Sequence, residues 1–154
     1  MAEFRSIYEQ YGRPVYRFLL KLTGDQNDAE ELLSETFYRA YISIDKFEGR
    51  CSVYTWLCGI GKNAWLSECR RRKRTVPVYA PDVGSPEQSV VEREQYRIVR
   101  EAIAALSEPY RDVLITHLYG EVPLKEIAAQ YGKSESWARV TYLRARKKIT
   151  EELL

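Results

Sequence analysis

The 154-residue chain has no long apolar run, a single histidine and only three cysteines. No stretch approaches the roughly 18 apolar residues that a membrane-spanning helix needs, which excludes membrane insertion. The charged residues Glu3 and Arg5 stand where a secretory signal would be apolar, so we expect no signal peptide. Cys51, Cys58 and Cys69 contain no CxxC pair, so neither a zinc site nor a disulfide framework is expected. These absences predict an intracellular protein without a metal site.

The patterns of known catalytic sites are missing as well. His117 is the one histidine, and it stands in an apolar helical pattern where a packed core histidine is the usual interpretation. The chain has no HExxH, Walker or nucleophile-elbow motif, and the glycines at 59 and 61 lack the remaining spacing of a phosphate loop. The carboxylates fall in first turns and on polar faces of predicted helices. The sequence therefore favours binding over catalysis.

Strand patterns are also absent, because Val, Ile and Thr never alternate with polar residues for long. Apolar side chains instead recur every three or four residues, as in helices with one buried face. A first such segment covers residues 4–11 and is predicted to end at Gly12; Pro14 is predicted to begin a second. The fold class is therefore all-α.

Two longer helices follow in the N-terminal half. The first has its apolar stripe over residues 29–44 and is capped by Asp25 or Asn27, between which the sequence does not choose. The second is capped by Ser52 and runs into five consecutive cations at residues 70–74. We expect these segments to form a bundle of three or four helices.

Residues 75–89 change character, with three prolines, a glycine and no helical period, which is typical of a linker. Helix resumes near Val90, and residues 107–110 (SEPY) indicate the start of a further helix. We therefore predict two small helical domains joined by a flexible linker. Their expected ranges are residues 1–74, the linker 75–90 and residues 91–154.

Residues 124–149 are predicted to be two helices with a tight turn at Gly132 and a cap at Ser134, a helix-turn-helix pattern. Along the second helix one row at steps of four, three and four residues is predicted to pack inward: Ala138, Tyr142, Ala145 and Ile149. The intervening side chains are predicted to point mostly outward: Trp137, Arg139, Val140, Leu143 and Arg144.

Exposed apolar side chains beside arginines are unusual on a merely solvated surface but suit the DNA major groove, where Arg pairs with guanine and apolar atoms meet thymine methyls. Residues 133–148 hold six basic side chains against one acid. Arg146, Lys147 and Lys148 would follow the phosphate backbone. The alternative is a structural helix pair with Trp137 packed into its own domain.

Residues 53–74 form a second candidate surface. Tyr54, Trp56 and Trp65 alternate with polar residues that include Lys62 and Asn63, and the cations of residues 70–74 follow. Rings and cations together can stack and neutralise single-stranded DNA, and an asparagine amide can pair with a flipped base. The alternative is that Trp56 belongs to the core and the cations form a solvated helix end.

Three segments resemble the extracytoplasmic-function group of bacterial sigma-70 factors. Residues 28–41 (DAEELLSETFYRAY) are similar to its polymerase-binding helix, residues 47–63 (FEGRCSVYTWLCGIGKN) to its −10 recognition and melting segment, and residues 126–149 to its −35 reader. The order of the segments and the position of the linker match as well. The resemblance implies no catalysis and no cofactor. It implies two partners, promoter DNA and core RNA polymerase. The polymerase would be bound through the clamp coiled coil of its largest subunit and the flap of its second-largest subunit. A third implied partner is an anti-sigma factor, which can hold the cytoplasmic protein at the membrane.

The resemblance assigns roles to individual positions. The polymerase-binding positions are Asp28, Glu31, Glu35, Phe37 and Tyr38. The −10 positions are Tyr54, Trp56, Lys62, Asn63, Arg70 and Arg71. The −35 positions are Ser134, Trp137, Arg139, Val140, Leu143, Arg144, Arg146 and Lys147.

The chain departs from the family pattern at Trp137, Val140, Thr141 and Tyr142, so its −35 sequence preference is open. Two other functions also remain open. A free-standing helix-turn-helix regulator would usually dimerise on a palindrome, and a pure adaptor would use neither DNA surface.

Overall fold

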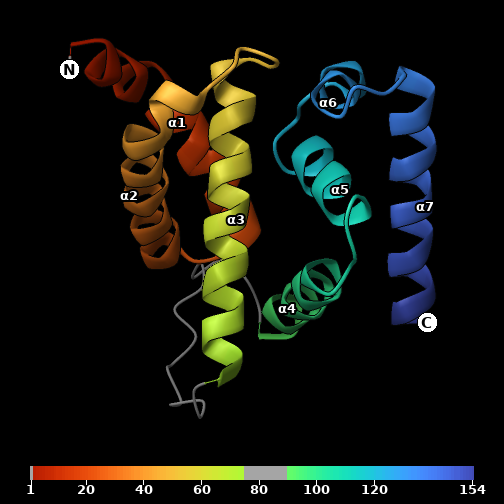
Figure 1. Cartoon of the computed structure of the whole chain (residues 1–154). Helices are drawn as coiled ribbons and strands as arrows, with labels where there is room; N and C mark the ends of the chain where they lie inside the picture. Colours follow the sequence, from red (N-terminus) through yellow and green to blue (C-terminus); the bar gives the residue numbers. More distant parts are fainter. Residues whose placement is uncertain (1, 75–89) are drawn as a thin grey trace.

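Helices form the described part of the chain, residues 2–74 and 90–154, in this computed structural model (Figure 1). No strand occurs within those two ranges, so the predicted all-α class is confirmed. The elements are α1 (Ala2–Thr23), α2 (Gln26–Ser43), the 3₁₀ turn η1 (Ile44–Lys46), α3 (Val53–Arg74), α4 (Val90–Ala104), α5 (Tyr110–Leu118), α6 (Leu124–Gln130) and α7 (Glu135–Leu153).

The first three helices pack against one another around Phe18, Leu22 and Leu57, which are almost completely buried. A close approach at Gly61 of α3 makes this packing possible. A Cβ atom there would lie 3.2 Å from Leu19 Cδ2 and 3.3 Å from Thr36 Oγ1, so even an alanine would require these side chains to shift by a few tenths of an ångström. The N-terminal bundle expected from the sequence is thus built from three long helices.

The predicted break at Gly12 is wrong, because α1 runs without interruption from Ala2 to Thr23 and includes Pro14. A proline inside a helix usually costs about 3 kcal/mol or more. The apolar stripe continues across the position, however, from Tyr11 to Val15 and Phe18, and packs on the bundle core. Burial of that stripe outweighs the local preference, as tertiary packing usually does for helices in proteins.

Side-chain caps fix where the next two helices begin. Asp25, rather than Asn27, caps α2, and its Oδ1 accepts a hydrogen bond from the Asp28 backbone N–H at 2.9 Å. Ser52 caps α3 as predicted, because its Oγ accepts from the Thr55 N–H at 3.2 Å. These caps satisfy N–H groups that a helix start otherwise leaves unpaired.

The C-terminal half packs α5, α6 and α7 around the buried residues Val113, Val122 and Ile127. His117 is the packed histidine that the sequence predicts, since its Nδ1 lies 2.8 Å from the Val122 carbonyl oxygen and its ring lies 4.7 Å from that of Tyr142. Gly132 has a φ of +64°, the left-handed conformation that closes the turn between α6 and α7.

The two halves pack on each other. Ile103, Leu114 and Ile115 belong to the same buried cluster as Phe18 and Leu57 of the N-terminal bundle. Figure 1 shows α5 and α6 on one side of α3, with α7 at the outer edge. Helix α4 begins at Val90, as predicted, whereas residues 75–89 of the expected linker lie outside the described residues.

Candidate functional site

Helix α7 presents two opposite faces. Ser134 caps it, with its Oγ accepting from the Trp137 N–H at 3.1 Å. On the inner face Ala138 and Ala145 are fully buried, as the predicted inward row requires. The 19-residue helix is therefore held firmly along one side, and its other side is free to meet a partner.

The outer face of α7 mixes cations with apolar groups. Val140 is 44% exposed and Leu143 54% exposed, and both arginines of the row, Arg139 and Arg144, are exposed too. Arg139 lies 3.5 Å from Glu135 in a solvated pair, which is worth little and leaves the guanidinium available. Such a face fits a groove that offers both phosphates and thymine methyls.

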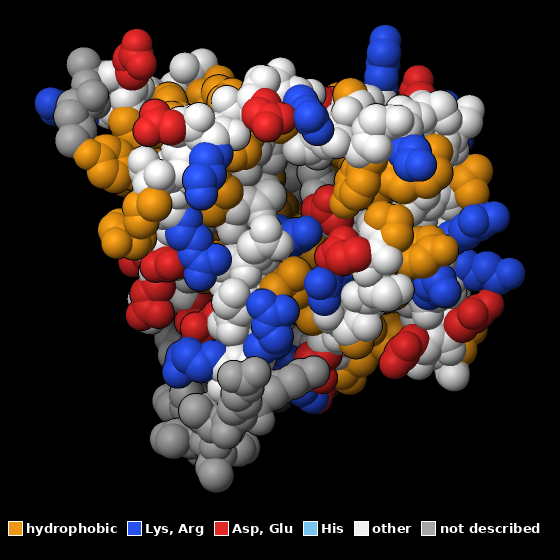
Figure 2. Space-filling view, in the orientation of Figure 1, with side chains coloured by type: hydrophobic (Ala, Val, Ile, Leu, Met, Phe, Trp, Pro, Cys, Tyr) orange, Lys and Arg blue, Asp and Glu red, His pale blue; other side chains and the backbone are white. Residues whose placement is uncertain are grey.

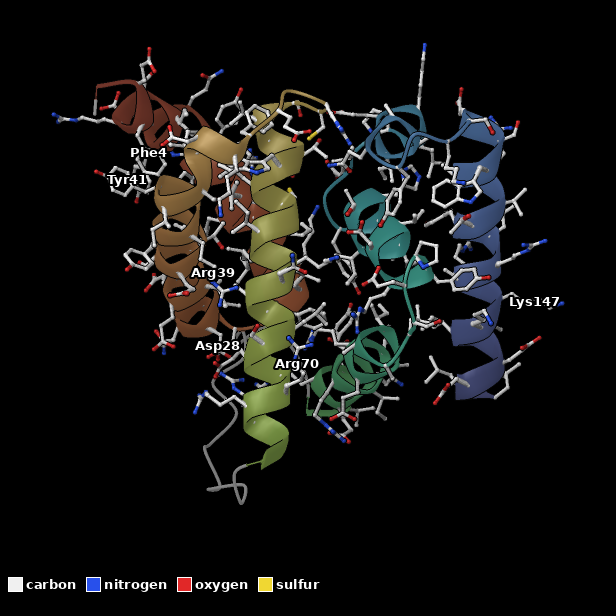
Figure 3. The ribbon with its side chains drawn as sticks, in the orientation of Figure 1. Phe4, Asp28, Arg39, Tyr41, Arg70 and Lys147 are labelled. Carbon is white, nitrogen blue, oxygen red and sulfur yellow. The ribbon has the colours of Figure 1, made fainter. Side chains whose placement is uncertain are left out.

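Cations extend this face toward the C-terminal end of α7. Arg146 and Lys147 are exposed, and Lys147 points away from the rest of the molecule (Figure 3). Figure 2 shows Lys and Arg side chains gathered over α7 and along the visible face of α3. Trp137, in contrast, is half-buried, with its ring 5.1 Å from that of Tyr131, so its packing in its own domain limits what it offers to DNA.

The predicted −10 residues of α3 fall into two groups, of which the first is accessible. Asn63, Arg70 and Arg71 are exposed, although Arg71 lies 2.5 Å from Glu68. Trp56 is half-buried against Phe47, with ring centroids 5.0 Å apart, and so braces the turn before α3. These residues leave an amide and cations available along one side of the helix.

The second group is covered by the C-terminal half of the chain. Lys62 is only 7% exposed, and its Nζ lies 2.9 Å from Asp112 Oδ1 and 3.7 Å from Glu108 Oε1. Tyr54 donates its hydroxyl hydrogen to the Gly120 carbonyl oxygen at 2.8 Å, and burial raises the pKa of this phenol, which keeps it a neutral donor. Contrary to the sequence prediction, neither side chain is open to DNA in this conformation.

Glu126 of α6 meets the N-terminus of α3. Its Oε1 accepts from the Ser52 N–H at 2.8 Å and from the Thr55 hydroxyl at 3.0 Å. Partial burial alone would raise its pKa, but the hydrogen bonds from Ser52 and Thr55 outweigh burial and lower the pKa. The carboxylate is therefore ionised at the positive end of a helix, where negative charge is favoured.

Sequence reasoning missed the carboxylates of Glu126, Asp112 and Glu108. Their partners lie far away along the chain, 74 residues for Ser52 and Glu126 and 50 for Lys62 and Asp112. No local spacing connects such positions, and each acid by itself looks like an ordinary helix-surface charge. A pattern based on helical periodicity cannot detect them.

Helix α2 carries the third candidate surface. Glu31, Glu35 and Tyr38 are exposed, and Tyr38 is 63% exposed. Phe37 lies on the buried stripe of α2, as its spacing predicts, and not on this surface: it is only 5% exposed, and its ring packs edge-on against that of Tyr8, with centroids 4.9 Å apart. Asp28 is half-buried at the start of α2 and lies 2.8 Å from Arg72 of α3, so it is already paired (Figure 3).

Apolar side chains surround this acidic row, and sequence reasoning did not assign them to a surface. Tyr8 is 49% exposed and Ile42 60% exposed, and Tyr41, expected on the buried stripe of α2, is 42% exposed. The feature of the sequence that could have revealed this surface is the presence of large apolar residues beside the acids. Together they form a protein-binding type of surface, with apolar and acidic groups side by side.

No helix in the two described ranges combines the length and apolarity needed to cross a bilayer. Within the same ranges, no group of three or more histidine, cysteine or carboxylate side chains is arranged to hold a metal ion.

Comparison with protein families identifies the class. The family model described as Sigma-70 region 2 matches residues 7–75, which include α1 to α3. The model described as Sigma-70, region 4 matches residues 96–149, which include the helix-turn-helix. The two matches define a bacterial sigma factor built of two helical domains.

Individual relatives narrow the class. The chain is 32% identical to the ECF RNA polymerase sigma factor SigM of Bacillus subtilis (strain 168) over 148 residues, which cover 93% of this chain and 90% of SigM. It is 27% identical to SigW of the same organism, over 80% of this chain and 74% of SigW. The chain therefore belongs to the extracytoplasmic-function (ECF) RNA polymerase sigma factors, which bind core RNA polymerase and direct promoter-specific initiation of transcription.

Solved structures share the fold. CnrH in complex with the cytosolic domain of CnrY is similar with a TM-score of 0.59 at 20% identity, covering 97% of this chain and 86% of that chain. The sigma factor RpoE of Bartonella quintana, in complex with the anti-sigma factor NepR, gives a TM-score of 0.58 at 21% identity, covering 99% and 98%. These similarities support the arrangement of helices described above.

Proposed function

We propose that the sigma factor divides its work between two domains. The domain of residues 1–74 binds the polymerase and captures −10 bases, and the domain of residues 91–154 reads the −35 duplex. Residues 75–90 connect them, so that both can engage one promoter. Two weak sites linked in this way gain effective concentration, which raises avidity by about 10²–10⁴.

The outer face of α7 is the observation that carries the −35 assignment. Arg139 and Arg144 are placed to pair with guanine or phosphate, and the exposed Val140 and Leu143 to meet thymine methyls. Arg146 and Lys147 extend the contact along the phosphate backbone. Ser134 and Trp137 stand at the N-terminal end of the helix, where backbone N–H groups favour a phosphate.

Helix α3 supplies the −10 contacts. The exposed amide of Asn63 can donate to and accept from the edge of a flipped base, and Arg70 and Arg71 can neutralise the strand. Trp56, stacked on Phe47, shapes the turn that leads into this helix. Tyr54 and Lys62 join the DNA contacts only after the C-terminal half has left α3.

The polymerase-binding role falls to the exposed face of α2. Glu31, Glu35 and Tyr38 present acids and an aromatic ring to the clamp coiled coil of the largest subunit, and the buried Phe37 supports the face from behind. Aromatic side chains are enriched among the residues that dominate interface energies. The C-terminal domain would meet the flap of the second-largest subunit.

An anti-sigma factor is a further proposed partner. The fold matches CnrH and RpoE, which were solved with CnrY and with the anti-sigma factor NepR. Binding of such a protein would control when the sigma factor reaches polymerase in the cytoplasm.

Run-off transcription with core polymerase over a promoter library tests this function. Wild-type protein should select one −35 and one −10 sequence. Changing Arg139→Ala together with Arg144→Ala should relax selection at −35 bases by about 1–3 kcal/mol per lost contact. Arg97→Ala is the control, because Arg97 is exposed on α4 and pairs with Glu101 of its own helix.

Two results would contradict the proposal. Unchanged −35 selection in the double variant would reject the assignment of α7. Tight, specific binding of a palindromic site without polymerase would favour the free-standing regulator instead.

A further inference from the structure

A groove lies between α1 and the turn that follows α5. Its volume is about 560 Å³, within the range of about 300–1,000 Å³ that is usual for small-molecule sites. One wall is a single face of α1, whose residues follow at steps of four, three and four: Gln10, Pro14, Arg17 and Lys21. The turn at Tyr119 and Glu121 forms the opposite wall. The groove is therefore built from segments that lie far apart along the chain.

Pro14 gives the α1 wall an acceptor that ordinary helices lack. A helical carbonyl normally accepts from the N–H four residues later, but proline has no N–H. The backbone carbonyl of Gln10 therefore has no such donor at position 14, and the exposed side-chain amide of Gln10 belongs to the same wall. Burial of the apolar stripe explains how α1 tolerates the proline, but it gives the proline no role. A carbonyl acceptor beside an amide is a suitable partner for the amino group of a nucleobase.

Two cations follow Pro14 on the same wall. Arg17 is exposed and makes no hydrogen bond or ion pair with any residue that the structure describes. Lys21 lies 3.3 Å from Glu121, but both side chains are solvent-exposed, so this pair is worth little. Guanidinium and ammonium groups are the side chains that bind phosphate. Arg17 and Lys21 are about 6 Å apart along the helix axis, so both can reach one phosphate group.

Tyrosine rings complete the groove. Tyr119 is half-buried in the wall opposite α1, and Tyr54 lines the groove near Arg17. Burial raises the pKa of Tyr54, and the positive charge of Arg17 opposes part of that rise, as a nearby guanidinium should. Rings and cations in one groove are the combination that holds a nucleotide, because the base can stack while the phosphate is neutralised.

The rim of the groove carries a residue in an unusual conformation. Glu121 has a φ of +58°, and it is the one non-glycine residue with a positive φ in the described ranges. This left-handed conformation is uncommon for residues with a side chain, and such outliers cluster at binding sites. Its carboxylate pairs with Lys21 and therefore competes with any phosphate for that cation.

We propose that this groove is a nucleotide site, in which a base with an amino group packs between Gln10 and the tyrosine rings and its phosphate binds Arg17 and Lys21. The site goes beyond the proposed function, which uses α2, α3 and α7 and assigns nothing to α1. The nucleotide is either free in solution or one unit of a DNA strand, since both present the same chemistry. An occupant that contacts both walls stabilises the folded protein by mass action.

Calorimetric titration of the full chain tests the site with AMP, with inorganic phosphate and with a short DNA single strand that lacks the selected −10 sequence. Arg17→Ala removes the guanidinium from the groove. Arg5→Ala is the matched control, because Arg5 is an exposed arginine of the same helix that pairs with Glu9, about 18 Å along the axis from Arg17. Glu121→Gln removes the competing carboxylate.

Wild type should bind AMP more tightly than phosphate, and AMP should raise its melting temperature. Arg17→Ala should weaken AMP binding about tenfold, Glu121→Gln should strengthen it, and Arg5→Ala should match wild type. Pro14→Ala returns an N–H to the Gln10 carbonyl, so it should weaken binding of AMP but not of phosphate. Binding of the DNA strand without binding of AMP, weakened by Arg17→Ala and not by Arg5→Ala, would identify a DNA strand as the source of the nucleotide.

The inference is overturned if wild type binds neither AMP nor the strand, or if Arg17→Ala and Arg5→Ala bind as tightly as each other. Equal affinity of wild type for AMP and phosphate would overturn the base contact. Circular dichroism checks that the variants fold, which the exposed positions of Arg17 and Glu121 favour. Run-off transcription is measured separately, and its failure with wild type would reject the proposed function while leaving the titration of the groove to stand.

Discussion

The surfaces of α3 and α7 contain similar residues but are used differently in this structure. Each has aromatic side chains and contains a run of cations. On α7 the arginine and apolar row is open to solvent, whereas on α3 Lys62 is buried in an ion pair and Tyr54 is bonded to the other half. Composition therefore shows where DNA-binding chemistry is available, and packing determines when it can be used.

Removing one cation from each surface is the strongest test of this difference between α3 and α7. Lys62→Ala leaves Asp112 half-buried without its main partner, so the free energy of unfolding should fall by about 3 kcal/mol. Arg139→Ala removes an exposed side chain and should stay within about 0.5 kcal/mol of wild type. Urea unfolding measures both. Equal, small effects would mean that the Lys62 pair contributes nothing to the packing of the halves.

The exposed part of α3 provides the next prediction. Asn63→Ala should raise the free-energy barrier to open-complex formation by about 1–3 kcal/mol, the range for one good side-chain contact to a base. Polymerase binding should stay unchanged. A fluorescent base in the melted region reports opening, and a gel shift with core polymerase reports binding. An unaltered opening signal would remove Asn63 from base capture and leave α7 as the one DNA surface with support.

The smallest expected effect is the pH dependence of the stability that Glu126 contributes. Its pKa is lowered in the folded protein, so its contribution to stability is present above the ordinary glutamate value of about 4.3 and is lost as pH falls through the lowered value. The difference in unfolding free energy between wild type and Glu126→Gln should therefore disappear in acid.

Urea unfolding from neutral pH downward measures this difference. The neighbouring thiols do not interfere, because burial raises the pKa of Cys58 to about 12 and also raises that of Cys51. A difference that persists at low pH would mean that the charge of Glu126 has no part in holding α3.

Much of the fold could be predicted from local sequence patterns, namely helical spacing and capping residues. The inward row of α7, its cap at Ser134 and the packed His117 all agree with the structure. The row and the cap depend on neighbours within about two helical turns, over which side-chain spacing and capping preferences act directly. The helix-turn-helix could be predicted for the same reason.

Local pattern failed where distant segments compete with it. Gly12 and Pro14 do not interrupt α1, because its apolar stripe is buried against the bundle on both sides of them. Tyr41 belongs to the apolar stripe of residues 29–44 that was expected to be buried, but it is 42% exposed. Its exposure depends on where α1 lies, which helical spacing on α2 leaves unspecified.

The sequence by itself therefore determined the helices, the family and the residue types that each surface offers. The pairing of Glu126 and Asp112 with α3 was decided by tertiary structure alone. Hydrophobic periodicity and capping act between near neighbours, whereas an ion pair between residues 50 positions apart exists only once two helices have been brought together.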